Sequence, residues 1–156
     1  MTQNQEILYD SRFGNLTPEV AEKIRKSREE AKNLADTFVP ADAKYSKLLR
    51  LDNEVEFYYY TPAYRYEVEF DTKREMVKGL AIERIAPVQQ VDTKISQDEA
   101  IAVLHEHYPD AKLLNIYQYV ESGNDIYEME FLLDNCHGEM DVLAADGTIL
   151  DIDIDY

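Results

Sequence analysis

The carboxylates at the C-terminal end are the first side chains whose types and spacing could do chemistry. In the run LDIDIDY, Asp151, Asp153 and Asp155 alternate with apolar residues. On a strand they therefore share one face, with neighbours about 7 Å apart. One cation bridges that spacing only if the side chains converge, and the glycine and glutamate of an EF-hand loop are absent. Three interpretations stay open: a charged face that protects an edge strand from aggregation, a docking surface for a basic partner, or a calcium site.

Histidine and cysteine show no spacing that demands a metal or a nucleophile. His105 and His107 stand two apart on a predicted helix, so they do not form the i, i+4 pair of zinc sites. Cys136 and His137 are adjacent in a predicted turn, and the sequence indicates no third group that would orient the histidine. We therefore expect no metal and no cofactor.

The densest aromatic cluster consists of tyrosines at positions 58, 59, 60, 64 and 66. Alternation along a strand directs Tyr58 and Tyr60 to the face opposite Tyr59. Core and cross-strand packing accounts for the inward rings, whereas outward tyrosines are common in recognition surfaces. Tyr58 and Tyr60 are therefore candidate partner-contact residues, together with Asp151, Asp153 and Asp155.

Catalytic constellations are missing from the pattern. No Gly-rich phosphate loop, no Ser-His-Asp arrangement and no pair of catalytic carboxylates stands out. The sequence therefore predicts a protein that is not an enzyme.

Charge is distributed unevenly along the chain. The net charge is −16, and residues 95–156 hold 15 acidic side chains against one basic side chain, Lys112. Such a surface disfavours direct binding to the phosphates of nucleic acid and could attract a basic protein partner. Ordinary solubility is the simpler explanation of the same charge.

Length and composition indicate one ordinary domain or two very small ones, since the chain has 156 residues and is 45% hydrophobic. The N-terminus shows no signal sequence and no apolar stretch is long enough to span a membrane. We therefore expect no membrane association and a cytoplasmic protein as written, or an extracytoplasmic one if a signal has been trimmed. The single Cys136 forms no internal disulfide.

Two helices are predicted to position these residues. The first begins at Thr17-Pro18, with apolar residues at helical spacing, and ends before Pro40. Its predicted apolar stripe consists of Val20, Ile24, Ala31, Leu34 and Phe38. The second begins at Ser96, which forms a capping box with Glu99, and ends before Pro109.

The remaining segments favour strands because apolar and polar residues alternate between turn signals. The predicted strands span 55–60, 64–70, 75–85, 112–120, 125–133, 138–144 and 148–156. Turns are predicted at Ser122-Gly123-Asn124 and at Ala145-Asp146-Gly147.

The same elements recur in the same order, which predicts an internal duplication. Asp-Ala-Lys occurs at 42–44 and at 110–112, and YEVEF at 66–70 is nearly repeated by YEMEF at 127–131. The predicted fold class is α+β, with two repeats of one helix packed on an antiparallel β-meander. Whether the two meanders share one sheet stays open. The predicted divisions are an N-terminal arm (1–16), a first repeat (17–90) and a second repeat (91–156).

The second half also carries a recurring set of short phrases. They are Ile95-Ser96, Glu99-Ala100-Ile101, Tyr108-Pro109-Asp110-Ala111, Ile126-Tyr127-Glu128-Met129-Glu130-Phe131, Gly138-Glu139-Met140-Asp141-Val142 and Asp146-Gly147-Thr148-Ile149-Leu150. This half resembles the PepSY and PepSY-like domains over about residues 95–156. The first half matches only through the internal repeat.

The resemblance implies a helix packed on an antiparallel sheet and no shared catalytic residues. It also implies a domain that is usually exported or membrane-attached, occurs in protease propeptides and inhibits or modulates a partner. This chain departs from that pattern because no signal or anchor is visible.

The leading hypothesis is a non-catalytic protein-interaction module, an inhibitor or modulator of an unidentified partner whose binding surface is basic. The first alternative is an acidic mimic of nucleic acid that occupies a DNA- or RNA-binding protein. The second is a carrier of a small apolar ligand held between helix and sheet. The sequence does not give the oligomeric state.

Overall fold

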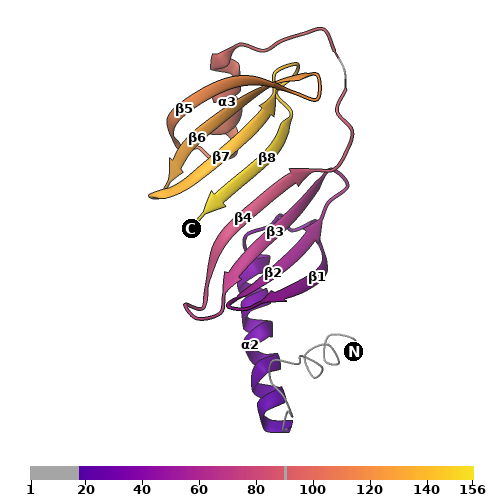
Figure 1. Cartoon of the computed structure of the whole chain (residues 1–156), viewed down its shortest axis with the longest axis vertical. Coiled ribbons are helices and arrows are strands. Elements are labelled where there is room, and N and C mark those ends of the chain that lie inside the picture. Colours follow the sequence, from indigo (N-terminus) through magenta and orange to yellow (C-terminus); the bar gives the residue numbers. More distant parts are fainter. Residues whose placement is uncertain (1–17, 90) are drawn as a thin grey trace.

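The computed structural model describes residues 18–89 and 91–156, which form one antiparallel sheet of eight strands with two helices on one of its faces (Figure 1). The order across the sheet is β1-β2-β3-β4-β8-β7-β6-β5. The helices are α2 (Pro18–Asp36) and α3 (Gln97–His107). The strands are β1 (Lys44–Leu51), β2 (Glu54–Tyr60), β3 (Tyr64–Asp71), β4 (Met76–Arg84), β5 (Lys112–Glu121), β6 (Asn124–Leu133), β7 (Cys136–Leu143) and β8 (Ile149–Asp155).

The α+β class is confirmed, but the prediction of two helix-on-meander repeats is wrong. Strands β4 and β8, each the last strand of its half, pair along Gly79–Glu83 and Asp151–Asp155, so the two predicted meanders merge into a single sheet. The physical reason is that each meander alone would leave a long strand edge with unsatisfied backbone groups. Pairing these two edges satisfies both sets of groups at once.

The two repeated phrases do not lie on equivalent strands of the two halves, although an internal duplication would place both on the same central strand of each meander. Residues 66–70 lie on β3, the third strand of the first half, whereas residues 127–131 lie on β6, the second strand of the second half. The cause is β1 (Lys44–Leu51), which is not among the predicted strands. In strand order, β6 corresponds to β2, whose residues 54–57 read EVEF.

The two phrases nevertheless divide their side chains between core and solvent as strand alternation predicts. Tyr66, Val68 and Phe70 are buried, as are Tyr127, Met129 and Phe131, while the intervening glutamates are partly exposed. Alternation along a strand therefore predicted correctly which side chains enter the core.

Both helices pack on the same face and share one core. The core cluster joins Ala31 and Ala35 of α2, Ala100 and Leu104 of α3, and the inward residues of the strands. In the predicted stripe of α2, Ala31 is buried, but Leu34 is 41% exposed and its neighbour Ala35 is fully buried instead. The side chains of Val20 and Ile24 lie outside the described part of the chain.

Local signals at the second helix and at the turns are confirmed. The Ser96 hydroxyl accepts a hydrogen bond from the Glu99 N–H at 3.1 Å, and the Glu99 carboxylate accepts one from the Ser96 N–H at 3.2 Å. Positive φ angles at Ser122 and Gly123 form the β5–β6 turn, and Gly147 has a φ of 78° before β8. These turns fix the register that aligns side chains across β5–β8.

The predicted N-terminal arm, residues 1–16, lies outside the described residues. The boundary between the predicted repeats falls between β4 and α3, and the division into repeats stays a prediction. Within the described residues, no helix is both long and apolar enough to cross a membrane.

Candidate functional site

The side of the sheet opposite the two helices is lined by polar side chains and carries all five predicted contact residues. Because Ile152 and Ile154 of β8 are buried in the core, Asp151, Asp153 and Asp155 point to the helix-free face. Figure 1 shows α2 and α3 together on the other side. The predicted aspartate face is therefore part of a larger surface.

Pairing across β6, β7 and β8 aligns further carboxylates with these aspartates. Asp151 is opposite Asp141, which is opposite Glu128, and Asp153 is opposite Glu139, which is opposite Glu130. On the other side of β8, Glu83 of β4 is opposite Asp151. We call this set the acidic sheet face: Glu83, Glu128, Glu130, Glu139, Asp141, Asp151, Asp153 and Asp155.

Several of these carboxylates have raised pKa values. Partial burial, followed by repulsion from Asp141 and Glu83, raises the pKa of Asp151 to about 6. Burial also raises the pKa of Asp153, with Glu139 and Asp155 adding to the shift. The pKa of Glu128 is raised by burial and then by Asp141. Burial and mutual repulsion therefore disfavour the ionised form of several carboxylates on the acidic sheet face.

One hydroxyl and one guanidinium partly offset this charge. The Tyr119 hydroxyl donates a hydrogen bond to Asp141 at 3.0 Å, which counteracts part of the burial-driven rise in the pKa of Asp141. The Arg65 guanidinium on β3 forms an ion pair with Glu83 at 2.6 Å. Among the described residues, no ion pair involves a carboxylate of β7 or β8.

The first half of the sheet is different because its helix-free face carries basic as well as acidic side chains. On the same helix-free face, Lys78 of β4 forms an ion pair with Glu54 of β2, and the Lys47 ammonium lies 5.2 Å from the centre of the Tyr58 ring. Glu56, Glu67 and Glu69 add negative charge on β2 and β3, but basic side chains on this face offset part of it, whereas β6, β7 and β8 contain no lysine or arginine.

Tyr58 and Tyr60 lie on β2, opposite in direction to the buried Tyr59, as alternation predicted. The Tyr58 hydroxyl donates to Glu56 at 2.5 Å and is 3.1 Å from Glu67. Burial, then the hydrogen bond to Glu56, raises the pKa of Tyr58. The Tyr59 hydroxyl instead donates to Asp36 of α2 at 2.5 Å. The structure does not bring Tyr58 and Tyr60 to the aspartates, because β3 and β4 separate β2 from β8.

The edge-strand interpretation of the C-terminal aspartates is wrong. β8 lies between β4 and β7, and the edges of the described sheet are β1 and β5. A strand paired on both sides has no free backbone groups to protect. The aspartates therefore need another explanation than the shielding of an edge.

His137 of β7 is opposite Asp155 and lies at the end of the acidic sheet face, whereas His105, His107 and Cys136 make local contacts. His105 Nε2 is 3.1 Å from the carbonyl oxygen of Ala111, and the His107 ring packs edge-on against Tyr108. Cys136 Sγ is 3.8 Å from the carbonyl oxygen of Asp134. Within residues 18–89 and 91–156, no group of three or more histidines, cysteines or carboxylates is arranged to hold a metal ion.

The carboxylates contributed by β4, β6 and β7 were not among the predicted site residues. Alternation in each strand already indicates which way Glu128, Glu130 and Glu139 point. What the sequence lacks is the strand order and register that align them with the aspartates of β8.

Comparison with known proteins gives a limited result. No protein-family model and no curated protein sequence matches the chain. The solved structures that resemble it include a candidate lipoprotein of Clostridium difficile 630, at 12% identity and a TM-score of 0.38, over 82% of this chain and 92% of that one. They also include a BLIP-like protein of Bacteroides fragilis, at 12% identity and a TM-score of 0.35, over 90% of this chain and 89% of that one.

The C-terminal domain of Bacillus megaterium YpeB is a third resemblance, at 11% identity and a TM-score of 0.35, over 85% of this chain and 65% of that one. Likenesses at TM-scores of this size carry no argument about activity. The resemblance to PepSY-like domains therefore stays a prediction.

Proposed function

We propose that this chain is a non-catalytic protein-binding module that docks through the acidic sheet face onto a basic surface of a partner protein. The observation that supports it is the alignment of carboxylates on β6, β7 and β8, with Asp151, Glu139 and Asp141 among them, on the face of the sheet opposite α2 and α3. A sheet offers such a row on rigid elements, which lowers the entropic cost of binding.

The raised pKa of Asp151 supports the same proposal on energetic grounds. Like charges directly opposite one another destabilise a sheet, and salt screens an exposed surface only in part. Cations on a partner would relieve the repulsion between these carboxylates, and that relief would contribute to the free energy of binding. The expected role is inhibition or modulation of the partner, in line with the PepSY-like resemblance.

A nucleic-acid mimic is the second candidate function, and one observation favours it. Carboxylates scattered on all sides would contradict it, whereas eight of them gather on the acidic sheet face. This candidate differs from the first only in the partner, which would be a protein whose basic surface normally holds phosphates. Competition by duplex DNA for the captured partner distinguishes the two.

The test is capture of partners from native lysate by the chain and by two neutralised variants. E139Q/D153N/D155N removes three charges from the acidic sheet face, and E29Q/E30Q/D98N removes three exposed charges from the helices. We expect the first variant to capture at least about tenfold less of a stoichiometric partner, and added salt to weaken capture by the unmodified chain. Equal capture by all three proteins would contradict the proposal.

A further inference from the structure

A cavity of about 580 Å³ lies on the helix-covered face of the sheet, above β3, β4 and β8, at the point where both helices end. Residues 37–40, which follow α2, form one side of it, and His107 and Tyr108 at the end of α3 form another. Its floor consists of inward side chains of the three strands, among them Leu80 and Ile152. The volume falls within the range of pockets that hold small molecules. The acidic sheet face is on the opposite side of the sheet, so the proposed protein-binding function does not use this cavity.

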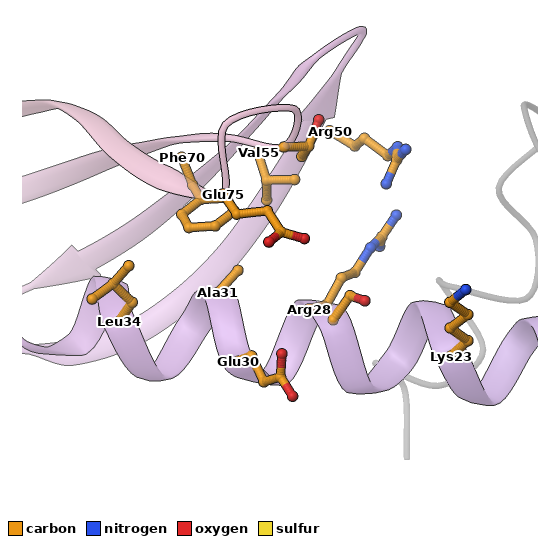
Figure 2. A pocket seen from close by; sticks show the side chains of 11 residues that line it. Lys23, Arg28, Glu30, Ala31, Leu34, Arg50, Val55, Phe70 and Glu75 are labelled. Carbon is orange, nitrogen blue, oxygen red and sulfur yellow. The ribbon is translucent and has the colours of Figure 1, made fainter.

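The lining of this cavity is uncharged, which distinguishes it from a smaller cavity between α2 and β1–β3. Figure 2 shows the charged side chains around the smaller cavity: Lys23, Arg28, Glu30, Arg50 and Glu75. The two arginines there already have interaction partners within the protein. Among the described residues that line the larger cavity, none is a lysine, arginine, aspartate or glutamate. Partial burial lowers the pKa of His107, so its imidazole is neutral near neutral pH.

The surroundings of the larger cavity disfavour an ionic ligand of either sign. α2 ends at Asp36 and α3 ends at His107, so both helices have their carbonyl ends, which carry partial negative charge, at the cavity. These ends oppose an anion. A cation would find no carboxylate in the lining to replace its lost hydration, and the Arg84 guanidinium already contacts the hydroxyl of Tyr64, at 3.3 Å. The ligand that suits this space is therefore uncharged.

Aromatic rings form much of the lining. They are Phe38, Tyr64, Tyr66, Tyr108 and Tyr156. Phe38 and Tyr156 meet edge to face with ring centres 5.2 Å apart, which joins the segment after α2 to the residue after β8. An aromatic ligand gains from edge-to-face and offset contacts with such rings, beyond the burial of its surface area. The lining therefore favours a ligand with an aromatic body.

Two tyrosine hydroxyls in the lining are available to a polar group on that ligand. The Tyr64 hydroxyl is engaged, since it donates to the carbonyl oxygen of Ile149 at 3.0 Å. Burial, followed by Tyr156 and Tyr66, raises the pKa of Tyr108, so these three hydroxyls lie near one another. Burial also raises the pKa of Tyr156. No hydrogen bond from the described part of the chain contributes to either shift, which leaves both hydroxyls for a ligand hydroxyl.

We propose that the cavity between the ends of α2 and α3 binds an uncharged aromatic molecule that carries a hydroxyl group, such as a naphthol or a phenylphenol. The rings lie among Phe38, Tyr66 and Ile152, and the ligand hydroxyl bonds to Tyr108 or Tyr156. This site is independent of the acidic sheet face, so it stands whether or not the chain binds a basic protein.

Fluorescence titration of the full chain with 2-naphthol tests the proposal. The chain contains no tryptophan, so the protein adds little background. 2-Naphthoate and 2-naphthylmethylammonium carry the same rings with a negative and a positive charge, respectively. We expect saturable, one-to-one binding of 2-naphthol, at least about tenfold tighter than that of either ion, because the lining does not compensate for the lost hydration of a charge. No saturable binding of 2-naphthol, or equal or tighter binding of either ion, would overturn the proposal.

Removal of the two hydroxyls tests the polar contact. The double variant Tyr108→Phe/Tyr156→Phe keeps both rings, and it should weaken the binding of 2-naphthol by about tenfold because the ligand hydroxyl loses its partners. The binding of naphthalene, which has no hydroxyl, should be unchanged. If 2-naphthol and naphthalene were affected equally, the assigned hydrogen bonds would be wrong.

Variants with an added ring locate the site. Val39→Phe places a larger side chain in the lining and should weaken 2-naphthol binding by at least about tenfold, because the ring occupies part of the space. Leu34→Phe makes a similar change in the lining of the smaller cavity and should leave binding unchanged. The variant E139Q/D153N/D155N, on the acidic sheet face, should also bind 2-naphthol like the unmodified chain. Thermal melts check that each variant folds. Equal losses in Val39→Phe and Leu34→Phe would overturn the assigned site.

Discussion

Asp151 faces acidic side chains on both neighbouring strands, Asp141 on β7 and Glu83 on β4. Sheets normally place opposite charges or uncharged residues at such positions, because like charges in register destabilise the pair. Arg65 forms an ion pair with Glu83, but burial, followed by repulsion from Asp141 and Glu83, raises the pKa of Asp151. This row of carboxylates therefore destabilises the folded state locally, and interactions elsewhere in the fold must compensate for it.

Asp151→Asn should stabilise the protein near neutral pH but not in acid. The pKa of Asp151 is raised to about 6 in the folded state, from 3.8. Between these values the folded state binds more protons than the unfolded state, so the stability of the unmodified chain falls as pH rises through about 6. Asn stays neutral and avoids that loss. Urea unfolding should give a gain on the order of 1 kcal/mol at about pH 7.5, discounted for solvent screening.

The same measurement at about pH 4 should show almost no difference, because Asp151 is then protonated in the folded state. Asp92→Asn, an exposed change between β4 and α3, is the matched control and should leave stability unchanged at both values. A gain that is equal at the two pH values would contradict the explanation through ionisation.

The direction of each candidate side chain could be predicted from alternation, but its electrostatic surroundings could not. Alternation alone assigns Tyr58, Tyr60 and Asp151 to the face opposite Tyr59 and Ile152. The neighbours of Asp151 come from residues 68 and 10 positions away, Glu83 and Asp141. Such proximity depends on strand order, which no local pattern encodes.

At the scale of elements, β6 and β7 fit together through a glycine under an aromatic ring. Gly138 of β7 is opposite Phe131 of β6, and a Cβ at position 138 would lie 2.5 Å from the ring. The ring itself packs against Tyr108 at the end of α3, with the ring centres 5.6 Å apart. The absence of a side chain at Gly138 thus leaves room for the Phe131 ring, which packs against β7 and against Tyr108 at the end of α3.

Gly138→Ala should destabilise the protein by about 2 kcal/mol, the usual cost of forcing an extra carbon into a packed core. Gly79→Ala is the matched control, since its Cβ would come closest to the carboxylate end of Glu69, at 2.9 Å, and lie at an ordinary contact distance of 3.6 Å from the Ile154 carbonyl oxygen. That side chain is free to move, so the control should lose less than about 1 kcal/mol. Urea unfolding provides both values.

Phe131→Leu in the Gly138→Ala background separates steric conflict from a general loss of strand stability. If the ring is the obstacle, the double variant loses less than the two single variants together. Additive losses would contradict the steric explanation.

Elements with strong local signals could be predicted, and the strand at the edge could not. The capping box at Ser96 and the turn at Ser122-Gly123 fix their elements through bonds made within a few residues. In contrast, β1 reads KYSKLLRL, which has adjacent apolar residues and a register shift between Tyr45 and Lys47. An edge strand has a neighbour on one side only, so its sequence is less constrained. Because the sequence pattern does not predict β1, it matches β3 with β6, whereas in strand order β6 corresponds to β2.

At the scale of the whole molecule, the joining of β4 to β8 decides whether the chain behaves as one unit or two. Ile82 of β4 is opposite Ile152 of β8, and both belong to the core that also includes α2 and α3. A continuous sheet above a continuous core leaves no plane along which the halves separate without exposing apolar surface. The sequence left this open, because each half contains its own helix and strands and either arrangement would use the same local patterns.

Ile82→Ala should therefore weaken both halves together. The truncation removes buried carbons beneath the β4–β8 pair, at a cost of about 2–4 kcal/mol. In native-state hydrogen exchange, the slowest amides of β2 and of β6 should lose protection by the same factor, since both exchange only when the whole sheet unfolds. Val120→Ala, at a residue 65% exposed on β5, should change neither. If β6 kept its protection while β2 lost it, the halves would unfold separately, and the paired edges of β4 and β8 would be a contact between two domains.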